Sequence, residues 1–228
     1  QLKEINNMIS SVLAVAPLRI SFIGGGTDFP DFYLKSNGAV VSCAIKKYVY
    51  VHVKRHDEAF QEKYRISYSE VEHTDSRSKI KNSIVRACLE FMDFDEPLQI
   101  STSSDLPAGS GLGSSSSLTA AILLSLHELR GEKPSQSQLA EETCEVEIDL
   151  LSKSIGKQDQ YISVFGGMNF IEFKNNGSVN VIPIKQKQEL LEDFLSKCML
   201  TWTKISREAD SVLTDQKMRI PVNHPLLK

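Results

Sequence analysis

We predict an α+β fold, because strand-like and helix-like segments alternate irregularly and one pair of strands reads as a hairpin. Residues 18–23, 39–53 and 64–69 are rich in β-branched and aromatic side chains, which is typical of strands. Residues 168–173 and 179–184 flank the segment Asn-Asn-Gly-Ser, which indicates a tight antiparallel turn. A sheet with antiparallel strands is not a doubly wound parallel sheet, so the mixed class is preferred.

The helices are predicted from the spacing of apolar residues and from capping signals. Ser135 with Gln138 three residues later forms a capping box, and Gly131 stops the helix before it. Short strands are expected at residues 98–102 and 199–203. The predicted helices cover residues 81–91, 115–129, 135–153, 186–196 and 207–216.

Composition excludes several classes of protein. The chain has 228 residues, 41% apolar and 24% charged, with a net charge of −3. That charge favours neither nucleic acid nor an anionic membrane as a partner, and no apolar run is long enough to span a bilayer. The cysteines are far apart and lack metal-ligand spacing, so we expect buried, reduced thiols and a cytoplasmic protein. They are Cys43, Cys88, Cys144 and Cys198.

The Gly/Ser segment from Pro107 to Ser117 indicates a phosphate-binding loop. Gly109, Gly111 and Gly113 allow backbone conformations and close approaches that other residues resist. The serines that follow open an apolar helix, whose N-terminus favours anions. The spacing matches neither the P-loop nor the dinucleotide fingerprint. The alternative, a flexible turn without a ligand, is disfavoured because the segment runs directly into the helix.

Glu147 lies on the wrong face of the predicted helix. On a regular helix the apolar face contains Ala140, Thr143, Cys144, Leu150 and Leu151. The opposite face contains Glu141, Glu142, Glu145, Asp149 and Lys153. Glu147 falls between Cys144 and Leu151, where an unpaired carboxylate would cost several kcal/mol. We therefore expect it to bind a cation such as Mg²⁺, or else a buried Arg or Lys.

The phosphate loop resembles the second motif of the GHMP kinases, Pro-x-x-x-Gly-Leu-Gly-Ser-Ser-x-Ser. That family includes galactokinase, homoserine kinase, mevalonate kinase and phosphomevalonate kinase. The resemblance implies that the loop wraps the phosphates of ATP and that Ser115, or alternatively Ser114, holds Mg²⁺ together with Glu147. The residues assigned to ATP are Pro107, Gly109, Ser110, Gly111, Leu112, Gly113, Ser114, Ser115 and Ser116.

Two further motifs indicate which residues lie near the hydroxyl that accepts the phosphoryl group. Gly156-Lys157-Gln158-Asp159-Gln160 is similar to a family segment whose Asp faces the substrate hydroxyl, although alone it could be turn chemistry. The resemblance implies that Asp159 is the base or orients that hydroxyl. Residues 16–28 resemble the first family motif, which implies that Arg19 pairs with Asp159 or with the transferring phosphoryl group. The alternative for Arg19 is an outward-facing strand residue.

The sugar would bind near the glycine turn that follows residue 23. By the same resemblance, Asp28 accepts hydrogen bonds from sugar hydroxyls; an Asx turn or helix cap is the alternative. The residues assigned to substrate are Gly25, Gly26, Thr27, Asp28, Lys157 and Gln158. The Gly-Gly-Gly-Thr-Asp variant, with residues 156–161 and 165–170, is most similar to bacterial D-glycero-D-manno-heptose 7-phosphate kinases; fucokinases come next. Candidates for a basic site that would bind the substrate phosphate are Lys46, Lys47, Lys157 and Arg207.

The expected fold is that of the GHMP kinases. Residues 1–185 would form the N-terminal ATP-binding domain, with a ribosomal S5 domain 2-like arrangement of sheet and helices. Residues 186–228 would begin an incomplete C-terminal α+β domain, because no glycine follows Gly177 and the family's third glycine-rich motif is missing. A non-catalytic nucleotide- or sugar-binding protein is the rival interpretation, as is a fucokinase- or galactokinase-type enzyme. A small sugar or sugar phosphate is the expected partner, and a homodimer is left open.

Overall fold

The computed structural model describes residues 9–57, 59–201 and 218–220, and its core is a seven-stranded mixed sheet. The strand order is β4-β3-β5-β2-β6-β7, and β1 pairs with β2 outside this path. The strands are β1 (Ser11–Ile23), β2 (Gly38–Arg55), β3 (Tyr64–Ser67), β4 (Val71–Thr74), β5 (Leu98–Ser104), β6 (Met168–Phe173) and β7 (Val179–Pro183). Among the strands of the described residues, only β3 and β5 pair in parallel.

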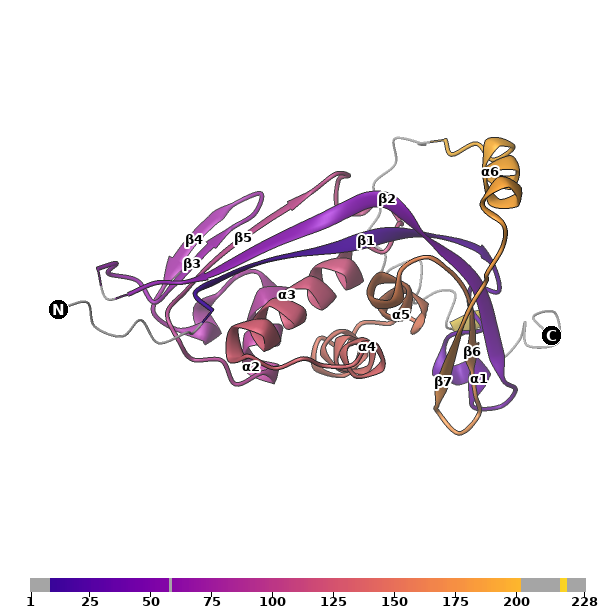
Figure 1. The fold of residues 1–228 in the computed structure, drawn as a ribbon. Helices are drawn as coiled ribbons and strands as arrows, with labels where there is room; N and C mark the ends of the chain where they lie inside the picture. Colours follow the sequence, from indigo (N-terminus) through magenta and orange to yellow (C-terminus); the bar gives the residue numbers. More distant parts are fainter. Residues whose placement is uncertain (1–8, 58, 202–217, 221–228) are drawn as a thin grey trace.

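Strand β2 joins the two halves of the sheet. Its first residues pair with β6, from Gly38 opposite Phe173, and its last residues pair with β5, to Arg55 opposite Leu98. Strand β1 runs antiparallel along β2, and its register shifts between Pro17 and Arg19. In Figure 1, the long strand β2 crosses the molecule and bends along its length. One continuous backbone therefore connects the two ends of the sheet.

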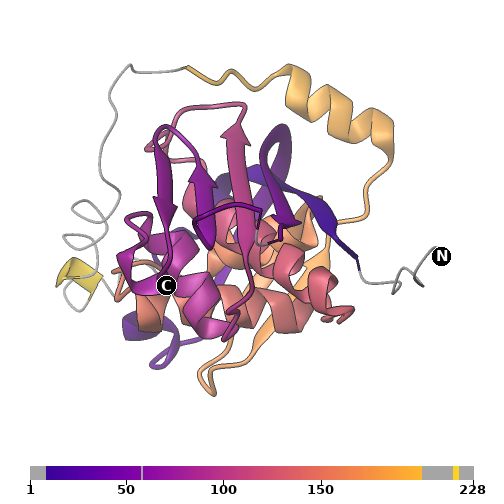
Figure 2. The same ribbon diagram turned by 90° about the vertical axis from the view of Figure 1, so that its left-hand side faces the viewer.

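The helices between β4 and β6 in the chain gather on one side of the sheet, in both Figure 1 and Figure 2. They are α2 (Ser83–Phe91), α3 (Ser114–Arg130), α4 (Gln136–Cys144), a π-helix (Glu145–Leu150) and α5 (Gln158–Phe165). The main core forms between them and the sheet, with Leu18, Val51, Ile100, Ile122 and Leu126 each 0% exposed. Helix α6 (Gln188–Ser196) lies on the other side of the sheet. Short helical turns occupy Pro30–Tyr33 (α1) and Arg77–Lys79.

The predicted capping signals are present at two helix ends, the start of α4 and the end of α3. The Ser135 hydroxyl accepts a hydrogen bond from the Gln138 N–H at 3.1 Å, which is half of the predicted capping box. Gly131 ends α3 with φ of 74°, a left-handed conformation that glycine adopts without strain. The β6–β7 hairpin is also present. The mixed sheet and its helices confirm the α+β prediction.

Other expectations were wrong or fall outside the described residues. Residues 199–201 form no strand; residues 202–203 and the predicted helix 207–216 are not described. Strand β4, helix α1, the turn at Arg77–Lys79 and helix α5 were missed, because three of them are only three or four residues long. No helix among the described residues is long and apolar enough to cross a membrane. The division into domains at residue 185 stays a prediction.

Candidate active site

The glycine-rich loop connects β5 to α3 and is fixed to strand β1. Gly109, Gly111 and Gly113 all have positive φ, between 74° and 76°, so the alternating glycines are needed for this backbone path. The backbone N–H of Arg19 donates to the Leu112 carbonyl at 3.0 Å. The Ser117 hydroxyl donates to the Pro17 carbonyl at 2.7 Å. These bonds hold the loop and the first turn of α3 against β1.

The N-terminus of α3 opens toward this loop. Gly113 is the N-cap in the left-handed conformation, and the helix begins with Ser114, Ser115 and Ser116. The first N–H groups of a helix have no intrahelical partner, and the helix dipole adds positive character there. The arrangement suits a phosphate group.

Arg19 and Asp159 form a bidentate ion pair beside the loop. Arg19 Nε donates to Asp159 Oδ1 at 2.6 Å, and Nη2 donates to Oδ2 at 2.5 Å. Arg19 Nη1 also donates to the Gly111 carbonyl at 2.7 Å. Gly113 lies against the pair, because a Cβ there would be 3.1 Å from Arg19 Cγ and 3.4 Å from Asp159 Oδ2. The pair and the phosphate loop are therefore in direct contact.

The charge of Arg19 is stabilised by its partner. Burial lowers the pKa of Arg19, but the charge and hydrogen bonds of Asp159, with the charge of Asp28, raise it above the ordinary value. The two side chains are 14% and 23% exposed, so the pair lines the surface of the site and can reach a ligand. Of the pairings left open for Arg19, the structure contains the one with Asp159. Asp159 lies in the first turn of helix α5, a helix that was not predicted.

Glu147 is fully buried and surrounded by donors. Its Oε1 accepts from the Ser115 hydroxyl at 2.5 Å and from Lys153 Nζ at 2.7 Å. Its Oε2 accepts from the Ser116 hydroxyl at 2.5 Å and from Gln160 Nε2 at 3.0 Å. The side chain is 0% exposed, as the sequence indicated, and its cationic partner is Lys153.

The predicted position of Lys153 on the opposite helical face was wrong. The helix changes from α to π at Glu145 and ends at Leu150, and Ser152 turns the chain with φ of 51°. This change of period brings Lys153 back toward Glu147 and leaves Leu150 52% exposed, although the regular helix placed it on the apolar face. Neither the role of Lys153 nor that of Gln160 was anticipated from the sequence.

The oxygen atoms around Glu147 fit a divalent metal ion. Ser115 Oγ and Glu147 Oε1 lie 2.5 Å apart and both already contact a cation, the ammonium of Lys153. Hydroxyl and carboxylate oxygens are the ligands that Mg²⁺ prefers, and nucleotide phosphates and water usually complete its shell. By their chemistry, these two oxygens therefore suit Mg²⁺ as part of its ligand shell.

Asp28 is a buried carboxylate held by backbone N–H groups. Its side chain accepts from Gly26 N at 3.0 Å and from Gln158 N at 3.2 Å, and the residue is 2% exposed. Burial raises the pKa of Asp28 to about 6, because these hydrogen bonds only partly offset the lost hydration and the charge of Asp159 adds to the rise. Gly156 packs against it, since a Cβ there would lie 2.0 Å from Asp28 Oδ2.

The other residues assigned to substrate have different surroundings. The Thr27 hydroxyl donates to the Gly24 and Ala39 carbonyls and accepts from Ala39 N, so its bonds fix the turn rather than face a ligand. Gly25 lies near the side-chain amide of Gln158, with 3.9 Å from an added Cβ to Nε2. The Lys157 ammonium lies 5.8 Å from the ring centroid of Tyr33. Lys46 and Lys47 are exposed on β2, and Arg207 is outside the described residues.

Buried polar atoms without a hydrogen-bond partner gather in this region. In the part of the chain that the structure describes, three side-chain oxygens are buried and unpaired. They are Ser110 Oγ, Gln158 Oε1 and Gln160 Oε1. Such atoms usually carry a partner in folded proteins. Their positions in the loop, beside Asp28 and beside Glu147 indicate where ligand atoms would bind.

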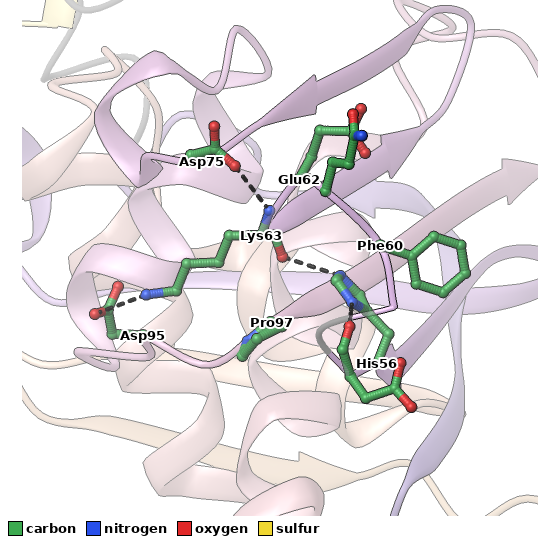
Figure 3. A pocket seen from close by; sticks show the side chains of 9 residues that line it. His56, Phe60, Glu62, Lys63, Asp75, Asp95 and Pro97 are labelled. Carbon is green, nitrogen blue, oxygen red and sulfur yellow. Dashed lines mark hydrogen bonds and ion pairs between the residues drawn. The ribbon is translucent and has the colours of Figure 1, made fainter.

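A hollow lies far from this site, where β2 ends and β3 and β5 begin (Figure 3). Lys63 Nζ binds Asp95 Oδ2 at 2.9 Å, and the Lys63 N–H donates to Asp75 at 3.2 Å. Both ring nitrogens of His56 contact backbone carbonyls, those of Asp57 and Lys63. The polar groups of this hollow satisfy one another, so it is a weaker candidate for a ligand.

Comparisons with known proteins find relatives of this chain. Residues 82–167 match the N-terminal domain of the GHMP kinases. The chain is 32% identical over 223 residues to D-glycero-alpha-D-manno-heptose 7-phosphate kinase of Campylobacter jejuni, covering 93% of this chain and 65% of that protein. It is 30% identical over 155 residues to galactokinase of Thermotoga maritima, covering 66% of this chain and 43% of that protein. The chain thus spans less than two thirds of either relative.

Solved structures share the fold. A D-glycero-D-manno-heptose 1-phosphate kinase from Bacteroides thetaiotaomicron superposes with a TM-score of 0.73 and 24% identity, covering 94% of this chain and 72% of that one. Galactokinase of Lactococcus lactis, complexed with galactose, gives a TM-score of 0.62 at 15% identity, covering 98% and 71%. With the loop, the Arg19–Asp159 pair and the family match in one region, the chain contains the N-terminal domain of a GHMP kinase.

Proposed function

We propose that this protein is an ATP-dependent sugar kinase that phosphorylates the anomeric hydroxyl of D-glycero-D-manno-heptose 7-phosphate. The observation that carries the proposal is the ion pair of Arg19 and Asp159, which contacts the phosphate loop at Gly111 and Gly113. A carboxylate that can accept the hydroxyl proton, held by a guanidinium beside a phosphate site, suits phosphoryl transfer to a hydroxyl. The similarity to the Campylobacter jejuni heptose 7-phosphate kinase supports the choice of acceptor.

ATP would bind with its phosphates at the loop and at the start of α3. The backbone N–H groups of the loop and of Ser114 to Ser116 would donate to phosphate oxygens, as would the unpaired Ser110 hydroxyl. Pro107 and Leu112 would shape the loop, and the bond from Arg19 N to the Leu112 carbonyl holds it in place. Much of the site is therefore formed before the nucleotide arrives.

Magnesium would be held by Glu147 and Ser115. When bound, Mg²⁺ neutralises phosphate charge and orients the phosphates. Ser116 and Gln160 hold the second oxygen of Glu147 and so fix the direction of the carboxylate. This arrangement favours Ser115 over Ser114 as the hydroxyl ligand, because Ser115 contacts the carboxylate directly.

The transfer itself would depend on Asp159 and Arg19. A carboxylate has about four acceptor positions, so Asp159 can accept the proton of the sugar hydroxyl while Arg19 occupies two of them. The oxygen then bonds to the γ-phosphorus as the bond to the β-phosphate oxygen breaks. Arg19 keeps Asp159 oriented and places positive charge beside the transferring group.

The sugar would bind at the glycine turn that contains Gly25 and Gly26. Asp28 and the free amide oxygen of Gln158 would accept hydrogen bonds from sugar hydroxyls. The Lys157 N–H donates to the Asp28 carbonyl, so Lys157 lies beside this turn and would contribute charge near the substrate. The hydrogen bonds of Thr27 would stabilise the turn. Three of the four cysteines are buried as expected, but Cys198 is exposed, so the expectation was wrong for that residue. A cytoplasmic location is part of the proposal.

The test is a coupled assay of ADP release with purified protein. Heptose 7-phosphate, fucose, galactose and mevalonate are supplied in parallel with Mg·ATP. We expect release with heptose 7-phosphate at a kcat/KM at least tenfold above the others. Release with fucose or galactose instead would reassign the acceptor. If the protein binds ATP but releases no ADP with any of the four acceptors, the non-catalytic binding protein is favoured.

A further inference from the structure

Lys153 occupies the place that the proposed function gives to a metal ion. Its ammonium lies 2.5 Å from Ser115 Oγ and 2.7 Å from Glu147 Oε1. These are the same two oxygens that would ligate Mg²⁺, and they are 2.5 Å from each other. An ammonium and a divalent cation bound to these same two oxygens would lie only about 4 Å apart, and their like charges disfavour binding both at once.

The backbone that delivers Lys153 is unusual. The π-helix of Glu145–Leu150 and the left-handed Ser152, with φ of 51°, separate Lys153 from the regular helix. The Lys153 N–H then donates to the Glu147 carbonyl at 3.1 Å. Single-turn π-helices cluster at functional sites, and a non-glycine residue with positive φ persists only where its surroundings impose it. The chain therefore has a local structure that places this ammonium on Glu147.

The position of Lys153 explains how Glu147 is tolerated without metal. A fully buried carboxylate needs a cation, and this one is 0% exposed. The Lys153 side chain is 17% exposed and has a flexible four-carbon stem, so its ammonium can move toward solvent without moving the backbone. Glu147 and Ser115, in contrast, lie on helical segments that fix their positions.

We propose that Lys153 is a displaceable counter-ion: it holds Glu147 and Ser115 in the metal-free protein and leaves them when a divalent cation binds. The inference rests on the proposed assignment of Mg²⁺ to Glu147 and Ser115. Its consequence is a competition between the ammonium and the metal. Removing the ammonium destabilises the metal-free protein and strengthens the effect of the metal, both on stability and on nucleotide binding.

Thermal unfolding tests the first consequence. Wild type, K153M and the control K197M are melted with EDTA and with MnCl2 or MgCl2, without nucleotide. Lys197 also pairs with a carboxylate, Asp193, at 2.7 Å, but both side chains are more than half exposed. We expect K153M to melt on the order of 5 °C lower than wild type in EDTA and to regain most of that loss with metal. K197M should follow wild type in both conditions.

Nucleotide affinity tests the second consequence. The Kd for ADP is measured by calorimetry in EDTA and in MgCl2, and the ratio of the two values reports how strongly metal and nucleotide assist each other. We expect this ratio to be about tenfold larger in K153M than in wild type. An unchanged ratio together with no metal-dependent rise in melting temperature would overturn the proposal. So would a K153M protein that loses ADP affinity equally in both solutions, which would make Lys153 a phosphate ligand.

Two further results keep the inference separate from the proposed function. If wild type neither binds ADP nor releases it from ATP, the kinase assignment fails, and the melting experiment with MnCl2 alone still decides the role of Lys153. If K153M does not fold, the double variant E147Q/K153M decides. Its folding would support a role of Lys153 through Glu147. Its failure to fold would contradict that role.

Discussion

Arg19 and Asp159 are 140 positions apart in the sequence, yet the guanidinium of Arg19 binds both carboxylate oxygens of Asp159. Strand β1 supplies one partner and the first turn of helix α5 supplies the other. Gly113, in the phosphate loop, lies against this pair, and a Cβ there would come within 3.1 Å of Arg19 Cγ. The geometry of transfer therefore depends on three segments that meet at one point.

The first prediction concerns the carboxylate of that pair. D159N should lower kcat at least 100-fold, because the amide cannot accept the hydroxyl proton and cannot pair with a guanidinium in the same way. The Kd for ADP should change little. D95N is the matched control, since Asp95 pairs with Lys63 in the distant hollow, and it should keep near-normal turnover. Near-normal turnover of D159N in the coupled assay would contradict the role of Asp159.

The second prediction concerns pH and Asp28. Because its pKa is raised to about 6 in the folded protein, the ionised form is the one that the fold disfavours. The contribution of this group to stability is therefore fully present below its unfolded pKa and is lost as the pH rises through about 6. A rise of this size corresponds to about 3 kcal/mol. Urea unfolding of wild type and D28N from pH 4 to 7.5 measures it.

The same titration should affect the sugar. Only ionised Asp28 accepts hydrogen bonds with both oxygens, so kcat/KM for the sugar should fall as the pH is lowered through about 6. D28N should lose this inflection while the KM for ATP stays close to that of wild type. If the two proteins show the same pH profile for the sugar, Asp28 does not bind it.

The third prediction compares two glycines with similar backbones. Gly113 and Gly177 have φ of 76° and 85°, so alanine at either position should cost about 1–2 kcal/mol of stability. A side chain at Gly177 meets nothing within 4 Å, whereas one at Gly113 meets Arg19 at 3.1 Å. G113A should therefore lose turnover and nucleotide affinity, and G177A should lose stability alone. Equal activities would show that the contact between Gly113 and Arg19 is dispensable.

The fourth prediction separates three neighbouring serines. S115A should raise the Mg²⁺ concentration needed for half-maximal activity several-fold, because it removes the proposed hydroxyl ligand. S116A should mainly lower stability, by about 1–3 kcal/mol, since it removes one hydrogen bond from a buried carboxylate. S114A should affect neither strongly. A larger effect of S114A than of S115A on the Mg²⁺ requirement would exchange their roles.

Local chemistry made much of this site predictable. The alternating glycines permit the positive φ that the loop adopts, and the length of the apolar run after them favours a helix. Glu147 was identified because it breaks an apolar face, an argument that needs only the helical period. The hairpin at β6–β7 followed from its turn residues in the same way.

The other features of the site could not be predicted from a regular helical period or from local sequence signals. Lys153 was placed on the wrong face because the π-helix changes the angle per residue over Glu145–Leu150. Helix α5 is eight residues long and begins without a side-chain cap, so no local signal marks its start. The pairing of Arg19 with Asp159 depends on how β1 and α5 pack against each other. The local sequence of neither segment predicts that packing.

The bonds that tie the loop to β1 have a consequence for affinity. Flexible glycine-rich loops lose conformational entropy when they close over a ligand, and that loss weakens binding. Here the Leu112 carbonyl accepts from Arg19 N, and the Gly111 carbonyl accepts from the Arg19 side chain. The ordering of the loop is thus completed during folding rather than during each encounter with nucleotide. The binding free energy of the phosphates is then available to position the γ-phosphoryl group for attack.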